Sequence, residues 1–163
     1  MSVPSSQRYL SVWLRRLSTD RIARRLPAQA NGAYVVVATI EQAQRIVALN
    51  DAAARLRLKP DMPLADARAM YPSLPVFEAD VEADHRLLEA IADWCDRYTP
   101  LVGLDPPDGL FLDITGCAHL FGGEQALAAQ ARREAGHASR HAFGPNAMAA
   151  RALARHARTR EAR

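Results

Sequence analysis

The pattern of apolar and polar positions predicts strands and helices in alternation. Strand-forming apolar residues fill 8–14 and 34–40, and the second run contains three consecutive valines, which is typical of a buried strand. Apolar residues recur at helical spacing over 84–98 and predict an amphipathic helix. Further elements are expected as helices over 18–26 (with Ser18 or Thr19 as N-cap), 50–58, 64–70, 124–134 and 147–158, and as a short strand over 74–77. This order favours an α/β fold.

Two segments give weak signals. Residues 41–48 mix apolar and polar side chains, and we expect them to lead into the following helix without forming a strand of their own. Residues 136–143 stand where a further strand would be needed, yet their Gly, His, Ala and Ser content is poor strand material.

Residues 97–116 predict the end of a helix followed by a β-hairpin. Pro106-Pro107 and Asp108-Gly109 are typical turn residues. After them, Leu110, Leu112 and Ile114 fall on one face of a strand, and Phe111 and Asp113 fall on the other. Asp108 and Asp113 are therefore candidate carboxylates for chemistry at the edge of a sheet. The plainer interpretation of Asp108 is an ordinary turn residue before Gly109.

Composition and charge narrow the classes of protein only slightly. The 163 residues carry a net charge of +3, which is compatible with nucleic-acid binding but typical of many other globular proteins. Cys95 and Cys117 have no metal-ligand spacing and are expected to be buried thiols. Neither a secretory signal nor an apolar run long enough to span a membrane is visible, so we expect a cytoplasmic protein.

The hairpin carries a resemblance to a known family. Phe111-Leu112-Asp113-Ile114-Thr115 is similar to the second half of the active-site hairpin of Y-family (UmuC-like) translesion DNA polymerases. Met62-Pro63-Leu64 and Ala67 resemble that family's fingers motif. The sequence of residues 104–123 resembles that of the ImuB-type branch, whose active site is degenerate.

The resemblance implies a fold and a layout. The expected fold is a polymerase palm, a ferredoxin-like mixed sheet with helices, together with a small fingers subdomain, truncated before the thumb and little finger. The implied layout is a disordered start over 1–7, a first palm strand over 8–16, a fingers-like region over 17–75, and the remainder of the palm, with a degenerate C-terminal end, over 76–163.

The positions that matter for catalysis depart from the family. Asp108 matches one of the family's acidic residues, but Trp13 and Gly109 replace the other two. Neither tryptophan nor glycine offers the oxygen ligands that Mg²⁺ prefers. The resemblance therefore implies no catalytic residues, no metal site and no cofactor, with Mg²⁺ expected only if an alternative acidic set exists.

Nucleotide binding is expected to be lost as well. Asp51 and Ala54 replace the tyrosine and arginine with which the family grips the incoming triphosphate, so no nucleotide-binding residues are expected. Arg57 and Asp61 stand at positions where the family has glycine, which places the local turn in question.

The remaining candidate residues are basic or histidine. Arg15, Arg16, Arg21, Arg24 and Arg25 form the densest basic group and are expected either to contact DNA phosphates or to form a solvated helix face. The arginines from Arg151 onward are expected to form a loose, solvated tail. His137 and His141 have an i, i+4 spacing without a third ligand, so no metal is expected there.

The function implied by the resemblance is that of a non-catalytic polymerase homologue acting as a scaffold in translesion synthesis, damage-induced mutagenesis and DNA repair. Its implied partners are DNA, an error-prone polymerase, an ImuA-like protein and the sliding clamp, with no membrane partner. Three alternatives stay open: an active DNA-directed nucleotidyltransferase with displaced acidic ligands, a DNA-binding module, and a nonfunctional truncated product.

Overall fold

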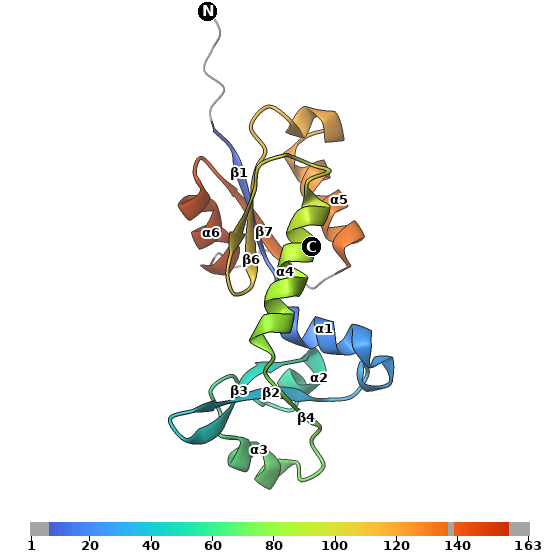
Figure 1. The fold of residues 1–163 in the computed structure, drawn as a ribbon, viewed down its shortest axis with the longest axis vertical. Coiled ribbons are helices and arrows are strands. Elements are labelled where there is room, and N and C mark those ends of the chain that lie inside the picture. Colours follow the sequence, from blue (N-terminus) through green and yellow to red (C-terminus); the bar gives the residue numbers. More distant parts are fainter. Residues whose placement is uncertain (1–6, 137–138, 157–163) are drawn as a thin grey trace, which may run out of the picture. The chain divides into compact units, whose positions relative to one another are not determined.

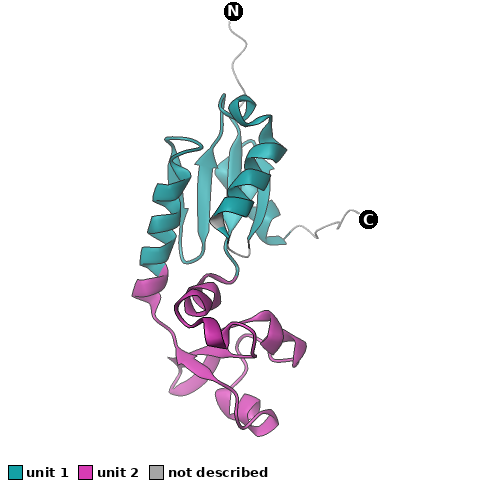
Figure 2. Cartoon of the chain, turned by 90° about the vertical axis from the view of Figure 1, so that its right-hand side faces the viewer, with its two compact units in different colours: residues 1–15, 85–163 teal, residues 16–84 magenta. Residues whose placement is uncertain are grey.

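The computed structural model describes residues 7–136 and 139–156, and these residues belong to two compact units (Figure 2). One unit combines residues 1–15 with 85–163 and is called the discontinuous unit below. The other comprises residues 16–84 and is called the inserted unit. The predicted fingers-like region ended at residue 75, whereas the contacts extend the inserted unit to residue 84.

The discontinuous unit is built on a four-stranded sheet in the order β5-β6-β1-β7, with every neighbouring pair antiparallel. Read along the chain, its strands and the two helices on one side of the sheet follow the βαββαβ order of a ferredoxin-like fold. A 3₁₀ helix, η2, precedes the second of these helices. The elements are β1 (Tyr9–Trp13), α4 (Val81–Cys95), β5 (Val102–Asp105), β6 (Gly109–Asp113), η2 (Ala118–Phe121), α5 (Glu124–Ala135), β7 (Arg140–Gly144) and α6 (Ala147–His156).

Helices cover both sides of this sheet: α4 and α5 lie on one side and α6 on the other (Figure 1). The core faces α4 and α5. Leu110, Leu112 and Ile114 are buried there, while Phe111 and Asp113 are partly exposed, which confirms the predicted alternation of the hairpin strand.

β7 forms although its residues are poor strand formers. It pairs with β1 along its whole length, from Tyr9 opposite Gly144 to Trp13 opposite Arg140. A Cβ added at Gly144 would lie 2.6 Å from the backbone nitrogen of Ala150, so the glycine lets α6 approach the strand closely. The doubt over residues 136–143 was therefore wrong for this segment, because pairing and packing outweigh intrinsic strand propensity.

The inserted unit holds a three-stranded sheet in the order β3-β2-β4, in which β2 pairs antiparallel with β3 and parallel with β4. A sheet with both parallel and antiparallel pairs was expected for the palm. The four-stranded sheet is purely antiparallel, and the mixed pairing is found in this three-stranded sheet. Val35, Val37, Ile46 and Leu64 are among the residues of its core. The elements are α1 (Leu17–Arg25), η1 (Pro27–Gln29), β2 (Val35–Ile40), β3 (Ala43–Leu49), α2 (Asp51–Arg55), α3 (Leu64–Met70) and β4 (Val76–Glu78).

β3 is the strand that the sequence pattern missed. It follows β2 after a two-residue turn in which Glu41 and Gln42 both have positive φ, of 49° and 65°. Those angles are typical of a hairpin turn that usually contains Asn or Gly. Because neither residue is a turn former, the hairpin gave no signal in the sequence.

The predicted cap of α1 is also wrong. Arg16 is the N-cap and makes no side-chain capping bond, while the Thr19 hydroxyl donates back to the Arg16 carbonyl at 3.1 Å. The Ser18 hydroxyl donates to Asp84. Asn50, by contrast, caps α2 by accepting a hydrogen bond from the Ala53 amide at 3.0 Å.

Among the described residues, no helix combines the length and the apolarity that a membrane crossing requires.

Candidate functional site

Three positions that the resemblance assigns to the family's acidic residues meet at one end of β1 and β6. Trp13 on β1 lies directly opposite Gly109 on β6. Asp108 precedes Gly109, and its carbonyl accepts a hydrogen bond from the Leu14 amide at 2.8 Å. The fold therefore brings these three positions together, with only one carboxylate among them.

Trp13 fills this end of the sheet with an aromatic ring. Its indole Nε1 donates to Asp108 Oδ2 at 2.9 Å. The guanidinium carbons of Arg155 and Arg140 lie 5.4 and 5.9 Å from the centre of the ring, which is within the range of cation–π attraction. An apolar, cation-attracting surface thus stands where a metal-binding carboxylate is expected in the family.

Two arginines of α6 neutralise the carboxylates of the hairpin turn. Arg155 donates one guanidinium nitrogen to Asp108 Oδ1 at 2.8 Å and to Asp105 Oδ2 at 3.1 Å. Arg151 donates Nε to the same Asp105 oxygen at 2.8 Å. The two arginines are four residues apart and therefore lie on one face of the helix. We call Asp105, Asp108, Arg151 and Arg155 the Arg–Asp cluster.

Three of the four side chains of the Arg–Asp cluster are largely withdrawn from solvent. The side chains of Asp105, Arg155 and Asp108 are 14%, 18% and 26% exposed. Burial by itself lowers the pKa of Arg155, but the hydrogen bonds that Arg155 donates to Asp108 and Asp105, together with the negative charges of these carboxylates, outweigh burial and raise the pKa overall. Arg155 therefore stays charged over the whole physiological range.

Gly109 is closely surrounded by the hairpin itself. A Cβ added there would lie 2.8 Å from Asp105 Oδ2 and 3.0 Å from the Asp105 carbonyl oxygen. A glutamate at this position would have to displace Asp105, which holds both arginines of α6. A side chain at position 109 therefore competes for space with the carboxylate that pairs with both arginines.

The residues at this site do not fit a two-metal centre. Such a centre needs several carboxylates with free oxygens, and here Asp108 offers one oxygen to Trp13 and the other to Arg155. Asp113 lies opposite Tyr9 at the far end of β1, and its Oδ1 accepts from the Thr115 amide. Within 7–136 and 139–156, no group of three or more His, Cys, Asp or Glu side chains could hold a metal ion.

The positions assigned to nucleotide binding lie in the inserted unit, at and just after the start of α2. Asp51 is exposed and forms an ion pair with Arg16. Ala54 is exposed and offers no donor to a phosphate. The side chain of Arg16 is thus paired with a carboxylate of its own unit.

The five arginines of the predicted basic group belong to both units. Arg15 is exposed in the discontinuous unit. In the inserted unit, Arg21 pairs with Asp84 at 2.6 Å, and Arg24 and Arg25 are exposed. Arg21 and Arg25 line an open hollow of about 370 Å³ that also contains Glu78 and Asp80. The group is therefore interleaved with acidic side chains.

Of the four residues of the Arg–Asp cluster, sequence reasoning singled out Asp108 and missed the other three. Arg151 and Arg155 do not belong to a loose, solvated tail, because both lie on α6 and pair with the hairpin. The available signal was their i, i+4 spacing within the predicted helix over 147–158. His137, the suggested partner of His141, lies outside the described residues.

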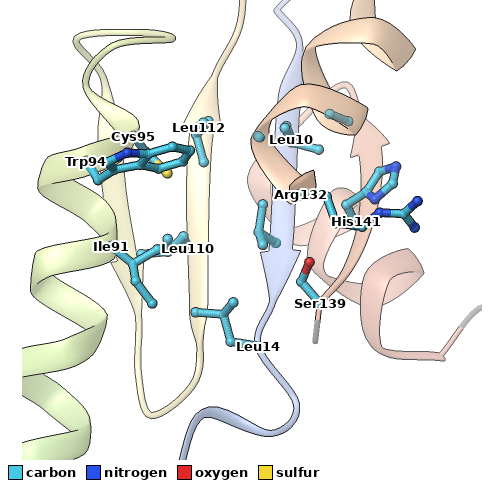
Figure 3. Close-up of a pocket in the computed structure, with 13 residues that line it drawn as sticks. Leu10, Leu14, Ile91, Trp94, Cys95, Leu110, Leu112, Arg132, Ser139 and His141 are labelled. Atoms are coloured by element: carbon cyan, nitrogen blue, oxygen red, sulfur yellow. The ribbon is translucent and has the colours of Figure 1, made fainter. Parts of the chain in front are cut away.

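A small apolar cavity lies between the sheet and the helices α4 and α5 (Figure 3). Its lining includes Ile91, Trp94, Leu110 and His141, and its volume is about 20 Å³. A cavity of this size holds about one water molecule. It is too small for a nucleotide and belongs to the packing of the core.

Comparison with known proteins gives a family and a fold. The model of the family described as impB/mucB/samB matches residues 20–155. Protein ImuB of Caulobacter vibrioides, from strain NA1000 / CB15N and equally from strain ATCC 19089 / CIP 103742 / CB 15, is 51% identical over 70 residues, which are 43% of this chain and 15% of that protein. The chain therefore matches only a small part of the length of these curated relatives.

Solved structures that resemble the chain include DNA polymerases. An insertion ternary complex of Dbh DNA polymerase matches with a TM-score of 0.79 at 17% identity, over 91% of this chain and 45% of that one. DinB from Sulfolobus solfataricus matches with a TM-score of 0.71 at 15% identity, with the same coverage. A Y-family polymerase chimera of Dbh and Dpo4 gives 0.72 at 15% identity, again over 91% and 45%.

At these identities the structures show the fold alone, whereas the family model covers most of the chain. The chain belongs to the impB/mucB/samB family, and its fold is that of the palm and fingers of Y-family DNA polymerases.

Proposed function

We propose that this chain is the palm and fingers part of a non-catalytic polymerase homologue, which acts as a scaffold in translesion synthesis and damage-induced mutagenesis. The observation that carries the proposal is the contact between Arg155 and Asp108, supported by Trp13 on the other oxygen of that carboxylate. Phosphoryl transfer by this fold needs metal ions at that carboxylate. A fixed positive charge less than 3 Å away repels a divalent cation.

Features of the inserted unit point the same way. Nucleotide binding by a polymerase requires donors for the triphosphate, and Asp51 contributes a negative charge instead. A chain that binds neither metal nor nucleotide can still present the surfaces of its fold to other molecules. We therefore place its role in assembly, with the chemistry left to an error-prone polymerase.

The partners that follow from this role are DNA, an error-prone polymerase, an ImuA-like protein and the sliding clamp, and the proposed location is the cytoplasm. These partners belong to the proposal for the whole protein, since this chain covers 15% of the length of ImuB. No cofactor is proposed.

Primer extension in Mg²⁺ with all four deoxynucleotides tests the proposal. The matched control is the palm and fingers part of Dbh, cut to the same length, so that the effect of missing domains is the same in both. Binding of a Mg²⁺–deoxynucleotide complex, measured by calorimetry, gives a second comparison that does not depend on the other domains.

We expect no incorporation and no Mg²⁺-dependent nucleotide binding by this chain, in a sample that circular dichroism shows to be folded. Incorporation that depends on Mg²⁺ and disappears in Asp108→Ala would overturn the proposal and favour the alternative of an active nucleotidyltransferase with displaced ligands.

A further inference from the structure

The two carboxylates of the Arg–Asp cluster converge on one atom. Asp108 Oδ1 and Asp105 Oδ2 both accept hydrogen bonds from the same nitrogen of Arg155, at 2.8 and 3.1 Å. Two oxygens that share one donor nitrogen lie within about 6 Å of each other. Two negative charges at this separation, both largely withdrawn from water, need a cation between them.

The fold supplies that cation from its own chain. Arg155 lies on α6, and α6 packs against β7 and β1 through the close contact of Gly144 with Ala150. The guanidinium is therefore held near the carboxylates without recruitment from solution. A tethered charge of this kind competes with free ions at a high effective concentration.

Further donors reach the two carboxylates. Asp108 Oδ2 accepts from the Trp13 indole, and Asp105 Oδ2 accepts from Arg151 in addition to Arg155. Asp108 thus has a donor on each oxygen. The ring of Trp13 in turn lies beside the Arg155 guanidinium, so the aromatic residue and the arginine stabilise the same arrangement.

We propose that Arg155 is the resident cation of this site: its guanidinium takes the place of a divalent metal ion between Asp105 and Asp108 and fastens α6 to the β5–β6 hairpin. The inference rests on the same site as the proposed function. It concerns cation binding, however, and not nucleotide incorporation, so either proposal can fail without the other.

The proposal predicts a site that opens when the arginine is removed. In Arg155→Met, a long uncharged side chain leaves both carboxylates without their shared donor, and a hard divalent cation can then bind to carboxylate oxygens. In Arg151→Met, Arg155 still bridges Asp105 and Asp108, so that variant serves as the matched control on the same helix.

Mn²⁺ binding to the whole 163-residue chain, measured by electron paramagnetic resonance, is the test. We expect Arg155→Met to bind Mn²⁺ at least about tenfold more tightly than the wild type and Arg151→Met. The gain should vanish in Asp105→Asn/Asp108→Asn/Arg155→Met. At a tenfold excess over its dissociation constant, Mn²⁺ should raise the melting temperature of Arg155→Met by about 4 °C and leave that of the wild type unchanged.

A folded Arg155→Met that gains no Mn²⁺ binding would overturn the proposal. If Arg155→Met prevents folding, the wild type and Asp108→Asn are compared by melting in Mn²⁺. Equal melting temperatures with and without Mn²⁺ in both would support a site already filled by arginine. A rise in the wild type that Asp108→Asn abolishes would overturn the proposal, because Mn²⁺ would then bind despite Arg155.

Discussion

At the scale of single residues, two non-glycine residues adopt backbone conformations that usually require glycine. Arg57 and Asp61 have φ of 65° and 68°, in the left-handed region that favours glycine. The resemblance to the family motif implies glycine at both positions, and here the turn forms without glycine. Asp61 still donates its amide to the Ile46 carbonyl at 2.7 Å, which fixes the turn against β3.

Arg57→Gly should therefore stabilise the protein. A left-handed conformation costs an L-residue roughly 1–2 kcal/mol, of which part is offset by the greater freedom of glycine in the unfolded state, so we expect a net gain of about 0.5–1 kcal/mol. Ala54→Gly, in the exposed part of α2 just before this turn, is the matched control and should cost about 0.5–1 kcal/mol. Urea denaturation measures both, and a loss of stability in Arg57→Gly would contradict the argument.

A side chain at Gly109 should disturb the Arg–Asp cluster. Gly109→Ala places a Cβ 2.8 Å from Asp105 Oδ2, and we expect a loss of about 1–3 kcal/mol from overpacking. Gly103→Ala on β5 meets nothing within 4 Å and should leave stability the same or raise it by up to about 1 kcal/mol. Thermal melting separates the two, and equal effects would show that the contact at Gly109 is relaxed without cost.

The sequence predicts the part of the candidate site whose residues belong to recognisable strand and turn motifs, and it does not predict the part supplied by α6. Trp13, Asp108 and Gly109 belong to recognisable strand and turn motifs, so their meeting follows from the resemblance. Arg151 and Arg155 belong to a helix about 40 residues further along the chain, and their contact depends on how α6 docks on the sheet. Nothing local in the sequence encodes that docking.

At the scale of elements, helices with clear periodicity were easier to predict than strands whose stability comes from pairing. The helix over 64–70 matches α3 residue for residue, since it begins after Pro63 and ends before Pro72. The helix expected over 50–58 ends as α2 at Arg55, because the chain turns into the left-handed region at Arg57. β3 and β7 depend on cross-strand partners, and a single sequence carries little trace of those partners.

His141 on β7 should make the stability of the folded protein fall in mild acid. Burial of His141, followed by the positive charge of Arg132, lowers the pKa of this histidine. The unfolded chain then takes up a proton near pH 6.5 that the folded protein resists, so stability falls as the pH drops below that value. We expect the unfolding midpoint of the wild type to fall more between pH 8 and pH 5.5 than that of His141→Gln, measured by urea denaturation. If the unfolding midpoints of the two proteins fall in parallel with pH, protonation of His141 does not lower the stability of the folded protein, and the argument is contradicted.

At the scale of the whole molecule, the two units differ in their spectroscopic signals. The chain has two tryptophans, Trp13 and Trp94, and both belong to the discontinuous unit. Tryptophan fluorescence therefore reports on that unit, while circular dichroism reports on the helices and strands of both. Two probes with different coverage can show whether the units unfold together.

Matched core substitutions test whether the two units unfold independently of each other. Leu64→Ala removes a buried side chain from the inserted unit, and Leu112→Ala removes one from the discontinuous unit, each at a cost of about 2–5 kcal/mol. We expect Leu112→Ala to shift the fluorescence transition in urea. Leu64→Ala should shift only the transition seen by circular dichroism. Coincident shifts in both signals for Leu64→Ala would mean that the units unfold as one.

The insertion of residues 16–84 also orders events during synthesis. β1 pairs with β6, which brings Tyr9 opposite Asp113, and with β7, which brings Tyr9 opposite Gly144. The first strand of that sheet therefore leaves the ribosome long before any partner strand exists. All strands of the inserted sheet are complete by Glu78, and its folding would shorten the loop that β1 must later close. β1, which is synthesised first, can pair only after β6 and β7 have been synthesised. Arg155, which joins α6 to the hairpin, is among the last described residues to be synthesised.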